Sequence, residues 1–125
     1  MAGFLKPSEC DLMPGTVEEF RRYRERMNQK ILASRNLQIQ RFFNLDTRAY
    51  EDGALSSKVK ELLGLVASLV LRCDDCITYH ILRCVEEGVT DAEFFEAFNV
   101  GLVVGGSITI PHLRRAVERL EECRH

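Results

Sequence analysis

The stretch SSKVKELLGLVASLVLR, residues 56–72, constrains the fold of this 125-residue chain more than any other part of the sequence. Its apolar residues recur every three or four positions, which is the period of an α-helix that turns one face to a core. That apolar face consists of Val59, Leu62, Leu63, Val66, Ala67 and Val70. Ser56 or Ser57 precedes the face and is suited to cap the helix N-terminus. We therefore predict a helix at about residues 57–72.

The helical period recurs along the rest of the chain, and no segment shows the apolar–polar alternation that indicates a β-strand. Thr16 with Glu19, and Thr90 with the glutamate three positions on, have the spacing of capping boxes, which mark helix N-termini. Gly88 is placed to end a helix. Besides the helix at 57–72, the sequence predicts helices at about 17–33 and 36–50, from the cysteine-rich stretch to Gly88, from Thr90 to Gly105-Gly106, and at about 109–123.

These helices are expected to form an all-α bundle. A chain of this length is long enough to bury one core but not two, so we predict one structural domain of about six helices. Within it, residues 1–54 form a helical lead-in that packs on a core of residues 55–123. The helix after Thr90, EFFEAFNVGLVV, is apolar on nearly all sides, which so small a domain can hardly bury. We expect its second face to contact another subunit of a homo-oligomer.

Charge and composition argue against several kinds of partner. Seventeen Lys and Arg residues are interspersed with nineteen Asp and Glu residues, so the net charge is −2 and a nucleic-acid partner is not expected. The N-terminus has no apolar run typical of a secretory signal, and the apolar stretch at 97–110 is too short and Gly-rich for a membrane span. Five cysteines, an odd number, argue against a disulfide framework. We expect a cytoplasmic protein with reduced thiols.

The motif RCDDCITYHILRC, residues 72–84, contains the side chains that are best suited to catalysis or metal binding. Cys73 and Cys76 form a C-x-x-C pair that we place at a helix start, where unpaired N–H groups and the helix dipole favour a thiolate. His80 follows Cys76 by one helical turn and is therefore placed to exchange a proton with it. Asp74 and Asp75 would raise the thiol pKa values unless they cap the helix, and we expect one of them to do so.

Two other interpretations of the motif stay open at this point. Zinc is one, because Cys73, Cys76, His80 and Cys84 are all potential ligands. Cys84 lies eight residues beyond Cys76, about 12 Å along a helix axis, and this distance argues against a zinc site made by all four residues. A zinc site with three of these ligands, completed by a distant residue, stays open. The other is packing, since buried Cys and His are common in helix cores. We expect Cys84 to be a core residue or a helix–helix contact, Cys10 and Cys123 to be incidental, and neither metal nor cofactor to be bound.

Glu61 extends the motif upstream, because it stands twelve positions before Cys73. The array E-x11-C-x-x-C-x-x-x-H, followed by EEGVTDAEFFEA and a Gly-Gly break, resembles the carboxymuconolactone decarboxylase superfamily, and more narrowly its alkyl hydroperoxidase D-like redox branch. The similarity covers residues 55–123. It implies that Cys76 is the nucleophile towards a peroxide, that Cys73 resolves the sulfenic acid into a disulfide, and that His80 and Glu61 form a proton relay. Some members of this branch place a histidine at the position of Asp75.

The resemblance implies a thiol-dependent peroxidase or disulfide oxidoreductase with antioxidant activity. Its partners would be a hydroperoxide or another small molecule and a thiol or disulfide reductant, and the family commonly assembles as trimers or hexamers. One alternative is a carboxymuconolactone decarboxylase-like lyase, in which His80 and Glu61 act as acid and base and the thiols are inert. Another is a non-catalytic oligomeric domain. The sequence identifies neither the substrate nor the electron donor.

Overall fold

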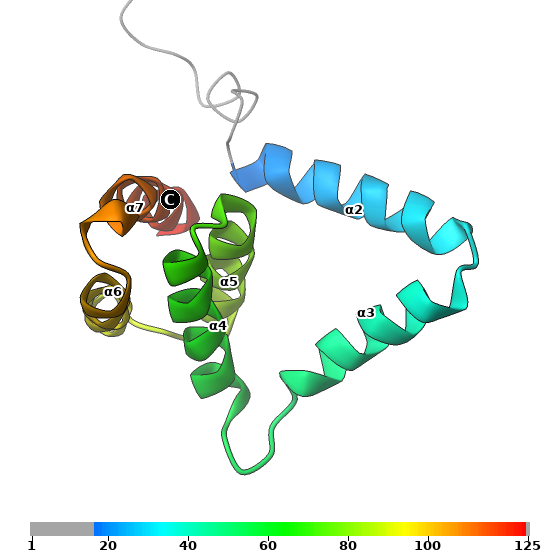
Figure 1. The fold of residues 1–125 in the computed structure, drawn as a ribbon, viewed down its shortest axis with the longest axis horizontal. Helices are drawn as coiled ribbons and strands as arrows, with labels where there is room; N and C mark the ends of the chain where they lie inside the picture. Colours follow the sequence, from blue (N-terminus) through cyan, green and yellow to red (C-terminus); the bar gives the residue numbers. More distant parts are fainter. Residues whose placement is uncertain (1–16, 125) are drawn as a thin grey trace, which may run out of the picture. The chain divides into compact units, whose positions relative to one another are not determined.

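The computed structural model describes residues 17–124, which contain six α-helices, one short 3₁₀-helix and no strand (Figure 1). The predicted all-α class and the number of helices are confirmed. In chain order the elements are α2 (Val17–Ala33), α3 (Leu37–Ala49), α4 (Ser57–Leu71), α5 (Asp74–Glu86), α6 (Asp91–Gly105), η1 (Ser107–Thr109) and α7 (Ile110–Arg124). No helix within the described range is long and apolar enough to span a membrane.

The chain divides into two compact units between Ala49 and Tyr50. This division falls near the predicted limit between lead-in and core at 54–55, and the packing of the lead-in on the core stays a prediction. The first unit consists of α2 and α3, which contact each other across a tight turn. Asn36 caps α3, because its side-chain Oδ1 accepts a hydrogen bond from the Ile39 N–H at 3.1 Å. The capping residue predicted for α2, Thr16, lies outside the described residues.

The second unit is built around α4 and α5, with α6 packed on α4 and α7 packed on α5. Its helix ends agree with the sequence. Thr90 and Glu93 form the predicted capping box, and Gly88 has the positive φ of +80° that suits glycine beyond a helix end. The apolar core is shared by all four helices and the loop before α6; it consists of Leu65, Leu69, Ile77, Ile81, Cys84, Val89, Phe94, Phe98, Ala116 and Leu120.

The buried face of α4 differs from the predicted one. Ser56 caps the helix as expected, accepting a hydrogen bond from the Val59 N–H at 3.2 Å. The buried residues, however, are Glu61, Leu65, Ser68 and Leu69. Of the predicted face, Leu62 packs against the core, whereas Val59 and Leu63 are 40% and 55% exposed. The spacing of apolar residues predicted the wrong buried face because α4 is apolar on more than one side. The helix turns its polar Glu61 inward, where α5 supplies a partner.

Candidate functional site

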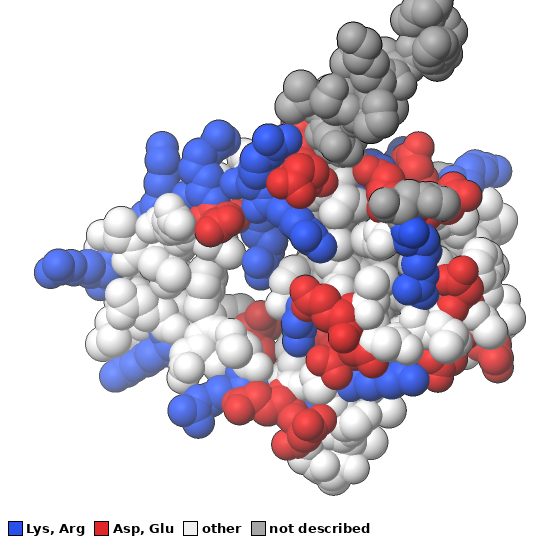
Figure 2. Space-filling view, turned by 180° about the vertical axis from the view of Figure 1, so that it is seen from behind, with Lys and Arg blue, Asp and Glu red and all other residues white. Residues whose placement is uncertain are grey.

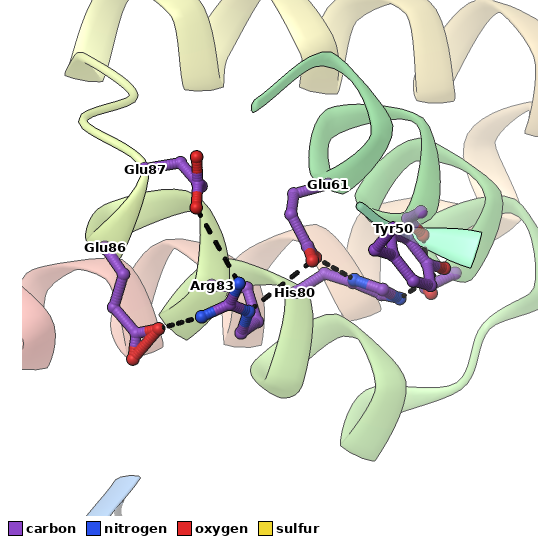
Figure 3. A network of polar contacts seen from close by, with 8 residues as sticks. Tyr50, Glu61, His80, Arg83, Glu86 and Glu87 are labelled. Carbon is purple, nitrogen blue, oxygen red and sulfur yellow. Dashed lines mark hydrogen bonds and ion pairs between the residues drawn. The ribbon is translucent and has the colours of Figure 1, made fainter. Parts of the chain in front are cut away.

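The site is centred on a buried pair formed by Glu61 of α4 and His80 of α5. Glu61 is 1% exposed and His80 8% exposed. Their side chains meet at 2.9 Å, between the His80 Nδ1 and the Glu61 Oε1 (Figure 3). A carboxylate only accepts hydrogen bonds, so Nδ1 holds the proton and Nε2 of the neutral ring is the acceptor. The structure thus brings together two residues that lie nineteen positions apart and leaves a basic nitrogen on the far side of the ring.

Gly64 makes room for this imidazole. It lies on α4 one turn after Glu61, and a Cβ atom at this position would stand 2.6 Å from the His80 Cε1. The ring therefore packs directly against helix backbone. A glycine inside a helix costs about 1 kcal/mol relative to alanine, and here that cost has a packing reason.

Tyr50 lies against the other nitrogen of His80. Its hydroxyl is 3.5 Å from the His80 Nε2, and the two ring centroids are 5.4 Å apart (Figure 3). Because Nδ1 is already engaged with Glu61, the hydroxyl is the donor in this contact. The sequence placed Tyr50 at the end of a predicted helix and gave no sign of this contact, since thirty positions separate the two residues.

Arg83 neutralises the second oxygen of the buried carboxylate. Its Nε lies 3.5 Å from the Glu61 Oε2, and its other nitrogens pair with Glu86, the last residue of the same helix, and with Glu87, which follows it (Figure 3). A buried carboxylate needs such partners, because desolvation disfavours its charged form. The sequence signal for Arg83 was its position three residues after His80, which places both side chains on one side of α5.

Cys73 and Cys76 lie at the start of α5, where Cys73 is the capping residue. Its sulfur accepts a hydrogen bond from the Cys76 N–H at 3.4 Å. The expectation that Asp74 or Asp75 caps the helix was therefore wrong. Asp74 instead turns to α7, where its carboxylate contacts the His112 Nδ1 at 2.8 Å and Arg115 at 3.2 Å. Cys73 caps the helix in place of the aspartates because only the residue before the first helical position can reach the first free N–H groups.

The pKa of Cys76 is raised to about 11. Partial burial is the largest cause, followed by the hydrogen bond and charge of Cys73 and by the charge of Asp75. The backbone N–H of the helix start acts in the opposite direction but is outweighed. Near neutral pH the surroundings of Cys76 therefore favour the thiol over the thiolate.

Two further cysteines, Cys84 and Cys123, lie in the described part of the chain. Cys84 is fully buried in the core, as expected, and burial raises its pKa to about 12. Cys123 is half-buried against the core, and Cys10 lies outside the described residues. Cys73, Cys76 and Cys84 are not in disulfide bonds. Within residues 17–124, no three or more His, Cys, Asp or Glu side chains are grouped so as to hold a metal ion.

Fold and site together define an all-α protein with a C-x-x-C pair at the start of α5 and, one helical turn later on α5, the histidine of a buried Glu–His pair. The sequence model of the carboxymuconolactone decarboxylase family matches residues 39–119. The chain belongs to this family. It is 28% identical to an uncharacterized protein of the cox locus of Paracoccus denitrificans over 81 residues, which are 65% of this chain and 73% of the relative. It is 29% identical to an uncharacterized Cupriavidus necator protein over 58 residues, which are 46% of this chain and about half (51%) of that relative.

Solved structures agree with this assignment. Two crystal structures of one Thermotoga maritima protein are 59% and 60% identical to this chain, with TM-scores of 0.83 and 0.80. They cover 86% and 85% of this chain, and the matches span 94% and 90% of theirs. The second is described as a carboxymuconolactone decarboxylase family protein with a suggested involvement in antioxidative response. A Legionella pneumophila family member shares the fold at 24% identity, with a TM-score of 0.79 over 85% of this chain and 95% of its own.

Proposed function

We propose that this protein is a thiol-dependent peroxidase or disulfide oxidoreductase in which Cys76 is the nucleophile and Cys73 the resolving thiol. The observation that most supports this function is the buried Glu61–His80 pair, in which His80 lies one helical turn after Cys76 on α5. The suggested antioxidative role of the Thermotoga maritima relative points in the same direction.

His80 is the base in this proposal. Glu61 holds the proton on Nδ1 and stabilises the imidazolium ion that forms when Nε2 accepts a proton from Cys76. The Tyr50 hydroxyl lies on Nε2, and because a hydroxyl both donates and accepts hydrogen bonds, it is suited to pass the thiol proton to that nitrogen. The Arg83 guanidinium lies 3.5 Å from the second oxygen of Glu61 and balances the charge of this carboxylate.

The proposed cycle balances with two thiols and an external reductant. The Cys76 thiolate attacks one peroxide oxygen, the O–O bond breaks, and the departing alkoxide takes the proton from His80 to leave as an alcohol. Cys76 is then a sulfenic acid, which the Cys73 thiol converts to a disulfide with release of water. A dithiol reductant restores both thiols by exchange. The hydrogen bond from the Cys76 N–H to the Cys73 sulfur keeps the resolving thiol beside the site of attack.

The test is to map the oxidised cysteines after one equivalent of an alkyl hydroperoxide. We expect a Cys73–Cys76 disulfide in the native protein, a sulfenic acid trapped by dimedone at Cys76 in Cys73→Ser, and no peroxide consumption in Cys76→Ser. Cys123→Ser is the matched control and is expected to behave as the native protein. Oxidation of Cys76 that never pairs with Cys73, or undiminished consumption by Cys76→Ser, contradicts the proposal.

A lyase reaction is the second candidate, and the raised pKa of Cys76 is the observation that favours it. In that case His80 and Glu61 would move protons on a small carboxylated ring and the thiols would be inert. The double variant Cys73→Ser, Cys76→Ser separates the two functions. Full turnover of a muconolactone-type substrate by the double variant supports the lyase and rejects the redox function.

A further inference from the structure

The carboxylate of Asp74, the residue after the first cysteine of the C-x-x-C pair, is bound at both oxygens by α7. Its Oδ1 accepts a hydrogen bond from the His112 Nδ1 at 2.8 Å, and its Oδ2 accepts one from the Arg115 Nη1 at 3.2 Å. His112 and Arg115 are three positions apart, so their side chains project from one side of α7. Asp74, His112 and Arg115 form an interhelical cluster that the proposed cycle does not use.

The position of His112 is set by the corner at which α7 begins. Thr109, the last residue of η1, is fully buried, and its hydroxyl donates a hydrogen bond to the Gly106 carbonyl oxygen at 2.8 Å. The buried residues of α7 are Ala116 and Leu120, and His112 stands one turn before Ala116 on the same side of the helix. The imidazole therefore projects towards α5, on which α7 packs.

Asp74 is the first residue of α5 and is held at its backbone as well as at its side chain. Its carbonyl oxygen accepts a hydrogen bond from the hydroxyl of Thr78, a buried residue, at 3.0 Å. Cys73 directly precedes Asp74, and Cys76 follows it by two positions. The cluster thus anchors to α7 the turn that carries both thiols.

Charge at this turn is important because the second unit is acidic. Residues 50–124 contain eight Lys and Arg residues and thirteen Asp and Glu residues, a net charge of −5. Figure 2 shows Asp and Glu over much of the visible surface, with Lys and Arg beside several of them. A carboxylate near a thiol disfavours the thiolate. The direction in which an aspartate of the motif points therefore affects how readily the thiols ionise.

The two aspartates of the motif act differently on Cys76. Burial is the largest cause of its raised pKa, followed by Cys73 and then by the charge of Asp75. Asp74, whose carboxylate is turned to α7, is not among these causes. The difference agrees with the contacts, because the charge of Asp74 is balanced by Arg115 on the side of the turn that faces α7.

We propose that His112 and Arg115 are positioning residues for the thiol pair, which hold the Asp74 carboxylate on α7 and thereby keep its negative charge away from the Cys76 sulfur. The inference rests on the proposed function in that it takes Cys76 to be the reacting thiol. Without these two partners, the Asp74 carboxylate would be free to turn towards the thiols and would disfavour the thiolate as Asp75 does. His112 and Arg115 thus act on Cys76 through Asp74.

The test is the rate at which iodoacetamide alkylates Cys76 at pH 8 in the full-length chain, with the modified residue identified by mass spectrometry. The double variant His112→Ala, Arg115→Ala is expected to react about threefold more slowly, as one further like charge in a solvated site would cause. The two side chains are 20% and 54% exposed, so the core is not disturbed, and far-UV circular dichroism checks the fold. His112→Asn retains a donor for Asp74 and is expected to react at nearly the native rate.

Asp74→Asn distinguishes positioning from a purely structural role. In the native chain it is expected to change the rate by less than about twofold, because the charge is already held away from the sulfur. In the double variant it is expected to restore the native rate, and this non-additivity shows that the residues act through one another. Arg114→Ala removes a basic charge from an exposed position next to the cluster, and this matched control is expected to leave the rate unchanged.

Three results would overturn the proposal. The first is a native rate in the double variant His112→Ala, Arg115→Ala. The second is a slow double variant that Asp74→Asn does not restore, which would leave the cluster a structural role only. The third is an Arg114→Ala variant as slow as the double variant. Alkylation involves no peroxide, so these results are independent of whether Cys76 reduces one.

Discussion

His80 packs against the bare backbone of Gly64, at a distance that leaves no room for a Cβ atom. The same ring is held by Glu61 at one nitrogen and contacted by Tyr50 at the other. The position of the imidazole is therefore set by three residues of the second unit, two of which lie on α4 and one just after the boundary at residue 49. Each of these contacts yields a separate prediction.

Gly64→Ala is expected to displace the His80 ring. The added methyl overlaps the imidazole, and relief of such an overlap costs about 1–3 kcal/mol, which outweighs the gain in helix propensity of about 1 kcal/mol. We expect a lower free energy of unfolding in urea and slower alkylation of Cys76. Ala67→Gly, at an exposed position of the same helix, measures the propensity effect alone. An alanine variant at residue 64 that is more stable than the native protein would show that the ring moves freely.

Tyr50→Phe removes the hydroxyl from the His80 Nε2 and retains the aromatic ring. If that hydroxyl passes the thiol proton, the rate of Cys76 with an alkyl hydroperoxide should fall about tenfold or more. The ¹⁵N shifts of His80 should also change, since Nε2 loses a hydrogen-bond donor. Tyr79→Phe is the control, because Tyr79 contacts the same imidazole edge-on with its ring, 5.2 Å between centroids. Equal rates in both variants would remove Tyr50 from the relay.

Glu61→Gln keeps the size of the side chain and removes its charge. His80 then loses the carboxylate that stabilises its protonated form, and we expect the peroxide reaction to slow about 100-fold. Glu86→Gln, which touches Arg83 but not His80, is the control within the same ion-pair network and should leave the rate nearly unchanged. A double variant, Glu61→Gln with His80→Ala, should be no slower than His80→Ala alone if both residues act as one unit.

The pH dependence of Cys76 follows from its raised pKa of about 11. The rate of alkylation by iodoacetamide should rise steadily with pH and show no plateau below pH 9. Asp75→Asn removes a negative charge that disfavours the thiolate, so its midpoint should move to lower pH. Asp91→Asn, at the start of another helix, serves as the control. A plateau near pH 7 in the native protein would mean that the thiolate is stabilised more strongly than its surroundings indicate.

Cys84 should make the fold sensitive to alkali. Its pKa is raised to about 12 in the folded protein by burial, whereas an unfolded cysteine ionises near 8.5. Above that pH the unfolded chain binds fewer protons than the native state, so stability falls as pH rises towards 12, by up to about 1.4 kcal/mol per pH unit. Cys84→Val should lose less stability than the native protein between pH 9 and 11 in urea unfolding. If the native protein and Cys84→Val lost the same amount of stability over this pH range, the effect would belong to groups other than Cys84.

Helix positions were predictable because they depend on local signals. Ser56, Gly88 and the Thr90–Glu93 box act within one or two turns, and each stands where the pattern placed it. The pairing of Glu61 with His80 was suggested by a family spacing, since nothing local connects residues on different helices. The choice of the buried face of α4 failed for the same reason, because it depends on what α5 presents to it.

Tyr50, Gly64 and Arg83 were not predicted as site residues. Tyr50 meets His80 only through tertiary packing, and a glycine inside an apolar helix is usually a neutral feature of sequence. The cap at Cys73 was missed because aspartate is the stronger capping residue in general, whereas here the helix starts one position too early for Asp74 to serve. The homo-oligomer, the substrate, the reductant and the cytoplasmic location stay predictions.

Ala49 ends α3, and the next residue is Tyr50, whose hydroxyl touches His80. The residue that follows α3 in the chain thus contacts an imidazole thirty positions further on. The second unit therefore cannot be shortened beyond its first residue without removing a contact to the His80 Nε2.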